Sequence, residues 1–100
     1  MKFVVTARHC EVPDDLKDRA EMVMQRAAPK AHRPHRAEVV FDVDHQRPMV
    51  ELRLFAAKGN VFSCRAEADD HRTALDRAES KLHNHLDKPV HKSIPREGIG

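Results

Sequence analysis

Apolar and polar residues alternate along four short stretches of the chain, which is the pattern of strands that bury one face. The first stretch covers residues 2–8, where Phe3 and Val5 are expected to face the core. Turns are expected at residues 45–48 and 57–60, so the last three strands form two antiparallel hairpins. Their core-facing positions are Ala37, Val39, Phe41, Val43, Val50, Leu52, Leu54, Ala56, Phe62, Cys64, Ala66 and Ala68.

Two further stretches repeat their core-facing residues at the spacing of a helix. The first helix is predicted to begin at Pro13, because proline and the acidic residues that follow it are favoured in a first turn. Pro29 is expected to end it, since the residue before a proline is disfavoured in the α region. The second helix is predicted over about residues 69–87, with Asp69 or Asp70 as its N-cap. The core-facing positions are Leu16, Ala20, Val23, Met24 and Ala27, then His71, Leu75, Ala78, Leu82 and Leu86.

The element order β-α-β-β-β-α predicts an α+β fold, in which two helices pack on one face of a four-stranded sheet. A chain of 100 residues with 40% hydrophobic content suffices for one modest core. We therefore expect a single domain over residues 1–92. Residues 93–100 contain one proline and two glycines and are expected to form a flexible C-terminal tail.

The composition argues against a membrane or secreted protein. There is no apolar run of about 18 residues, and the first residues lack the apolar stretch of a signal peptide. Cys10 and Cys64 are far apart in the sequence and are expected to be reduced thiols. We therefore expect a cytoplasmic protein without a membrane partner.

Catalytic and metal sites are also disfavoured. His83 and His85 are two residues apart on a helix and point about 200° away from each other, unlike an i, i+4 ligand pair. Adjacent acids such as Asp69 and Asp70 at a helix start are more often a cap than a catalytic pair. The sequence has no glycine-rich phosphate loop and no nucleophile motif. We expect neither an enzyme nor a cofactor, metal or small-molecule substrate.

The net charge is only +2, but basic residues concentrate in residues 29–36 and 81–100. Five of the eight histidines lie in the same two segments. The chain has four Phe and no Trp or Tyr, so recognition of single-stranded nucleic acid by base stacking is disfavoured. This distribution of charge favours contacts to a nucleic-acid backbone.

A basic row follows one side of the second predicted helix. Arg77 and Lys81 are four residues apart, Asn84 or His85 and then Lys88 follow at helical spacing, and Lys92 continues the row. A solvated face of mixed charge is the ordinary interpretation of such a helix. The acidic residues lie off the row, however, which favours neutralisation of RNA phosphates. The row faces residues 30–36 only if the helices pack side by side. The candidate RNA-binding residues from charge are Lys30, Arg33, Arg77, Lys81, His85, Lys88, His91 and Lys92.

The chain also resembles a known family. Residues 6–12 (TARHCEV) followed by a helix, and residues 66–70 (AEADD) followed by Ala74-Leu75, Lys81-Leu82 and Leu86, resemble the short ribosome hibernation promoting factors and ribosome-associated translation inhibitors. The resemblance spans residues 2 to about 92. It implies the same β-α-β-β-β-α fold, bound to the small ribosomal subunit (16S rRNA) in the cleft for messenger RNA and transfer RNA, where it blocks translation in stress or stationary phase. It assigns RNA contacts to Arg8, Lys81, Lys88 and Lys92.

The chain departs from the family pattern at several positions. Ala7 stands where a glycine is usual, so a positive φ there would be costly. His85 replaces a glutamine, and residues 88–92 (KPVHK) replace a lysine-rich run, so binding is expected to be weaker or more pH-sensitive. Pro89 is expected to end the helix. The long members of the family carry a second, dimerising domain, and we expect this protein to work without one, so that ribosome pairing would need a separate factor. The alternative function is a non-catalytic protein-binding regulatory module, whose acidic sheet face meets a protein partner.

Overall fold

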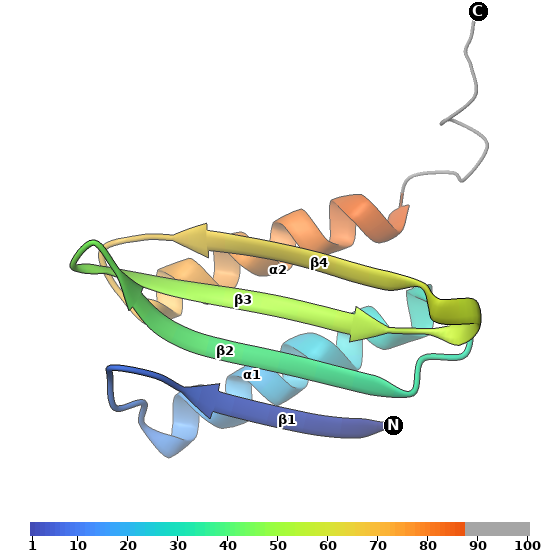
Figure 1. The fold of residues 1–100 in the computed structure, drawn as a ribbon, viewed down its shortest axis with the longest axis horizontal. Coiled ribbons are helices and arrows are strands. Elements are labelled where there is room, and N and C mark those ends of the chain that lie inside the picture. Colours follow the sequence, from blue (N-terminus) through green and yellow to red (C-terminus); the bar gives the residue numbers. More distant parts are fainter. Residues whose placement is uncertain (88–100) are drawn as a thin grey trace, which may run out of the picture.

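The computed structural model describes residues 1–87, and it is an α+β domain of the predicted element order (Figure 1). The predictions for Lys88, Pro89, His91, Lys92 and the tail from residue 93 lie outside the described residues. The elements are β1 (Lys2–Ala7), α1 (Asp14–Ala27), the 3₁₀ turn η1 (Ala28–Lys30), β2 (Arg36–Asp44), β3 (Arg47–Phe55), the 3₁₀ turn η2 (Ala57–Gly59), β4 (Val61–Glu67) and α2 (His71–Asp87).

The four strands form one mixed sheet in the order β1-β2-β3-β4. The strands β2, β3 and β4 pair antiparallel, as predicted, through short connections. The strand β1 pairs parallel with β2, because α1 carries the chain back to the end of the sheet at which β1 began. The edges of the sheet are therefore β1 and β4.

Both helices cover the same face of the sheet, as predicted (Figure 1). The register places Val39 opposite Leu52 and Leu52 opposite Cys64, so the core-facing positions of neighbouring strands meet in rows. On α2 the buried residues are Ala74, Leu75, Ala78 and Leu82. On α1 they are Ala20, Val23, Met24 and Ala27. Strand and helix periodicity thus identified most of the core from the sequence. They missed Ala74, which is fully buried, and they placed Val43 in the core although it is only half-buried.

The N-terminus of α2 has the predicted cap. The Oδ1 atom of Asp70 accepts a hydrogen bond of 2.7 Å from the backbone N–H of Thr73. This bond, first among several contributions, holds the pKa of the Asp70 carboxyl below its ordinary value. His71 is half-buried: its Nε2 atom lies 2.8 Å from the carbonyl oxygen of Asp42, and its ring meets the edge of Phe41. The core position that the pattern assigned to His71 is thus partly polar.

The region around Pro29 differs from the prediction. The α-helix ends at Ala27, but Ala28 keeps helical backbone angles, with φ −54° and ψ −43°. Pro29 lies in the 3₁₀ turn η1, and the chain becomes extended only at Ala31. The expectation that Pro29 would push its predecessor out of the α region was wrong. A proline in the first turn of a helical segment lacks only an N–H that the segment does not need there.

One turn is tighter than the sequence suggested, and another places its positive φ at a different residue. The β2–β3 connection is the pair His45 and Gln46, with φ of 52° and 66°, rather than four residues. Positive φ at both central positions is the geometry of a two-residue hairpin that follows the sheet twist. After β1, the positive φ of 60° falls on His9 and not on Ala7, so the alanine in place of glycine is tolerated.

We predict that Leu82→Ala, at a fully buried position of α2, lowers the free energy of unfolding by about 2 to 5 kcal/mol. The loss combines removed apolar contact with an incompletely filled cavity. Chemical denaturation measures it. Met22→Ala, on the exposed side of α1, is the control and should change stability by less than about 0.5 kcal/mol. Equal losses for the two variants would contradict this account of the core.

Candidate nucleic-acid interface

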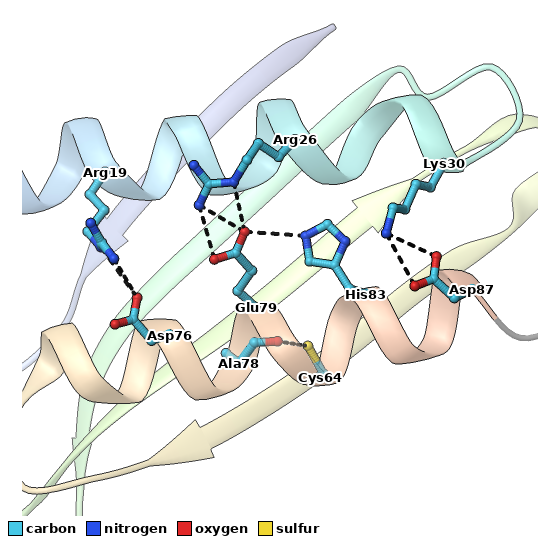
Figure 2. A network of polar contacts seen from close by, with 9 residues as sticks. All are labelled: Arg19, Arg26, Lys30, Cys64, Asp76, Ala78, Glu79, His83 and Asp87. Carbon is cyan, nitrogen blue, oxygen red and sulfur yellow. Dashed lines mark hydrogen bonds and ion pairs between the residues drawn. The ribbon is translucent and has the colours of Figure 1, made fainter.

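The acidic side of α2 faces α1 and is neutralised there (Figure 2). Arg19 binds Asp76 at 3.0 Å. Arg26 donates from its Nε and Nη2 atoms to both carboxylate oxygens of Glu79, the shortest contact being 2.9 Å. Lys30 binds Asp87 at 3.0 Å. These three pairs form an inter-helix ladder. Because each pair joins a basic residue of α1 or η1 to an acid of α2, the ladder removes the acids of α2 from the rest of its surface.

His83 also belongs to this side of α2. Its Nε2 atom lies 3.3 Å from Glu79 Oε2, one helical turn earlier (Figure 2). His83 therefore extends the ladder and lies away from the basic row, as the sequence had assigned it.

The basic row lies on the opposite flank of α2, beside the edge strand β4. Arg77 Nη1 donates a hydrogen bond of 3.0 Å to the carbonyl oxygen of Glu67. Lys81 Nζ donates one of 2.9 Å to the carbonyl oxygen of Arg65. Both side chains belong to exposed residues, so their charges face solvent beside the strand. The helices pack side by side, which the sequence analysis set as the condition for the row to face residues 30–36. The row nevertheless faces β4, so the condition is met without that juxtaposition.

A shallow groove of about 420 Å³ runs between β4 and the basic flank of α2. Its lining residues are Ser63, Cys64, Arg65, Lys81, Asn84 and His85. Among the described residues, no carboxylate lines it. The guanidinium of Arg65 binds Asp44 at 3.2 Å, so this arginine contributes mainly its backbone to the helix side. The groove therefore offers amide, hydroxyl and cationic groups to an anionic ligand.

The thiol of Cys64 also lines this groove, and it is unreactive. Its Sγ atom donates a hydrogen bond of 3.2 Å to the carbonyl oxygen of Ala78 (Figure 2). Burial, the largest cause, raises the pKa of Cys64 to about 11. The thiol is therefore protonated at neutral pH and acts as a packing group.

Three of the sequence-predicted residues lie away from the row. Lys30 is bound to Asp87 in the ladder, and Arg33 is an exposed residue of the following loop with φ 51°. Arg8 follows β1, and its Nε atom lies 3.6 Å from Asp42. Asp42 and Asp87 mark opposite ends of the domain, since α2 begins beside Asp42 and ends at Asp87. The structure thus brings together Arg77, Lys81 and His85, and it separates Arg8 from Lys30 and Arg33.

The surroundings of Arg8 include a second thiol and a perturbed carboxyl. His9 Nδ1 lies 2.9 Å from Asp42 Oδ1, and this hydrogen bond is the largest cause that lowers the pKa of Asp42. The backbone N–H of Val43 contributes in the same direction. Burial, followed by the charge of Asp42, raises the pKa of the Cys10 thiol. Arg8 is thus held beside a carboxylate that offsets much of its charge.

The outer face of the sheet is neutralised by its own arginines. Glu38 binds Arg36 at 2.7 Å, and Glu51 binds Arg53 at 3.0 Å. Asp44 is the partner of Arg65 already described. The acidic sheet face required by the protein-binding alternative is therefore balanced within the domain.

Sequence analysis missed the contribution of Ser63 and of the Arg65 backbone to the groove. The strand they belong to was predicted correctly, but its place at the sheet edge beside the basic flank was not. Within residues 1–87, no cluster of three or more His, Cys, Asp or Glu could hold a metal ion. None of the described helices is both long and apolar enough to span a membrane.

The fold and this flank define the class of protein: a small β-α-β-β-β-α domain that presents a basic helix flank beside an edge strand. The chain belongs to the family described as Sigma 54 modulation protein / S30EA ribosomal protein, whose family model matches residues 3–93. This membership agrees with the resemblance seen in the sequence. No curated protein matches the chain in a sequence search.

Solved structures share the fold, among them the following two. One is the N-terminal domain of Protein Y from Thermus thermophilus, with a TM-score of 0.72 and 22% identity over 86% of this chain and 96% of that one. The other is a ribosomal subunit interface protein from Coxiella burnetii, with a TM-score of 0.73 and 18% identity over 86% of this chain and 93% of that one.

We predict that Cys64 in a Cys10→Ser background reacts with a thiol-alkylating reagent far more slowly in the folded than in the unfolded chain. A pKa of about 11 leaves about a hundredfold less thiolate at pH 8 than the ordinary value of 9.0. The measurement is the alkylation rate followed by mass spectrometry, with and without denaturant. Similar rates in the two states would show that Cys64 is not buried as described.

Proposed function

We propose that the protein is a ribosome hibernation factor that binds the small ribosomal subunit in the decoding cleft and inhibits translation in stress or stationary phase. The single observation that carries the proposal is the segregation of charge on α2. The acids bind α1, and Arg77 and Lys81 remain exposed beside a groove without carboxylates.

The chemistry of this flank suits a nucleic-acid backbone. A cationic row neutralises successive phosphates without reading base sequence, which fits an RNA of fixed shape. Among the residues described, no Phe, Tyr or Trp lines the groove, and His85 is the one ring there that could stack on a base. The partner we infer is therefore structured 16S rRNA of the small subunit, contacted mainly through its phosphates.

Family membership supports a ribosomal partner, and the Coxiella relative is itself named as a ribosomal subunit interface protein. We infer a binding role without catalysis, in the cytoplasm, for one domain over residues 1–92. Lys88, His91 and Lys92 extend the proposed contact surface beyond α2. Arg8, Lys30 and Arg33 are proposed as secondary contacts at the two ends of the domain, and pairing of ribosomes would use a separate factor.

Arg77 and Lys81 are the firmest members of the surface and carry the first test. We predict that Arg77→Gln plus Lys81→Gln weakens co-sedimentation with small subunits and lowers the log–log salt slope by about two, one per charge removed. Glutamine removes the charge but keeps an N–H donor for the carbonyl groups of β4. The measurement is the bound fraction across a salt series.

The matched control is Lys17→Gln plus Arg72→Gln. Lys17 is exposed on α1, and Arg72 lies four residues before Asp76, on the side of α2 that faces α1. This pair removes the same charge and should leave the slope nearly unchanged. An equal loss for both pairs would mean that only net charge matters, and a wild-type slope near zero would exclude RNA-phosphate binding.

Histidine protonation provides a separate test. His85 lines the groove with Lys81 and Arg65, so a proton gained there would add positive charge beside the bound phosphate. We predict that affinity for small subunits rises about two- to fivefold between pH 7.5 and 6, the size of one exposed ion pair. His85→Gln should remove part of the rise, and His91→Gln added to it should remove a further part. A flat pH profile would remove both histidines from the site.

A further inference from the structure

The strand β4 is an open edge of the sheet. Its seven residues, VFSCRAE, pair with β3 on one side only. The strand contains neither proline nor glycine, and Val61 at its start is 50% exposed. Unpaired N–H and C=O groups along such an edge are a template on which another strand can add. A stable small domain therefore needs some device that blocks this edge.

The two hydrogen bonds from α2 to β4 are positioned to serve as that device. The carbonyl groups of Arg65 and Glu67 are two residues apart, so both point away from β3 towards the open edge. Lys81 and Arg77 occupy them at 2.9 and 3.0 Å.

The spacing of the two elements explains why both bonds form. Two strand residues span about 6.6 Å. Four helix residues rise about 6 Å. Because α2 runs antiparallel to β4, the later helix residue meets the earlier strand residue, and a single i, i+4 pair covers two successive edge acceptors.

We propose that Arg77 and Lys81 have a second role, which is to close the β4 edge against strand pairing with a second copy of this chain. The role rests on contacts within the chain, and it does not depend on the proposed function. The two side chains also place like charges along the edge, so an approaching copy meets repulsion as well as occupied acceptors.

A second copy fits the edge once it is open. Two β4 strands can pair antiparallel about a two-fold axis. The same residues of both copies then form the interface. With full overlap of the seven residues, Ser63 of one copy lies opposite Arg65 of the other, and Val61 lies opposite Glu67. No like charges face each other directly in this register. The residues of β4 themselves therefore allow this pairing, and the two side chains of α2 oppose it.

The test is the oligomeric state of Arg77→Met plus Lys81→Met, which removes both donors while keeping apolar side-chain bulk. We expect this double variant to form a dimer whose dissociation constant is at least about tenfold tighter than any self-association of the wild type. Sedimentation velocity over a range of protein concentrations, under reducing conditions, measures it. Hydrogen exchange should show new protection of the Ser63 and Arg65 amides in the dimer.

Three comparison variants distinguish the loss of the two edge hydrogen bonds from a change in net charge and from a loss of folding. Lys17→Met plus Arg72→Met removes the same charge elsewhere and should stay monomeric. Arg77→Lys plus Lys81→Arg keeps two cationic donors and should also stay monomeric. Lys81→Met alone frees one carbonyl acceptor and should dimerise more weakly than the double variant. If circular dichroism shows that the double variant is unfolded, Lys81→Met is used in its place.

Several results would overturn the proposal. These are a wild type that already dimerises through β4, donor-free variants that remain folded monomers, equal dimerisation of the Lys17 and Arg72 control, or a dimer without added protection at Ser63 and Arg65. Loss of ribosome binding tests the proposed function separately, since the glutamine variants used there keep a donor on each side chain.

Discussion

Phe41, Leu52 and Leu54 of the sheet are fully buried together with Leu75 and Leu82 of α2, and the positions of the charged groups follow from this burial. The sheet has one apolar face, and the two helices each have one apolar stripe, so both must pack on the same side. Once the stripes are buried, each helix has only two flanks left. One flank of α2 meets α1, and the other meets the edge of the sheet. The electrostatic surface of the domain is thus a consequence of where its apolar residues lie.

The ion pairs between the helices are individually weak. Apart from Glu79, which is 17% exposed, their side chains are 36% to 57% exposed, and such surface pairs contribute at most about 1 kcal/mol each. Their effect on function is larger than their effect on stability, because they bind the acids of α2 on the side facing α1. Without these ion pairs, the charges of Arg77 and Lys81 would be offset by those of the α2 acids Asp76, Glu79 and Asp87. A helix of mixed composition thereby presents one nearly pure basic flank.

Arg77 and Lys81 illustrate how one pair of side chains can answer two constraints. An edge strand needs its outward carbonyl groups covered, and a cationic donor covers a carbonyl well. The same cations, held beside a groove, are available to phosphate groups. Both bonds lie at the protein surface and each contributes modestly, so a phosphate can replace the carbonyl as the acceptor at small cost. In the proposed complex the RNA itself would lie along the flank and shield the edge.

The sequence by itself determined the order of the elements, most of their buried faces, a cap at Asp69 or Asp70, and a basic row of Arg77, Lys81 and either Asn84 or His85 on one side of α2. These features depend on residues within a few positions of one another, through strand and helix periodicity and through capping. The tertiary structure alone decided that β1 lies parallel beside β2, that Lys30 is bound to Asp87, and that the basic row faces β4 rather than residues 30–36. The physical reason is that such contacts join distant parts of the chain, as Arg19 and Asp76 are 57 residues apart. Local patterns place a residue on a face of its element, but only the packing of the elements determines what that face meets.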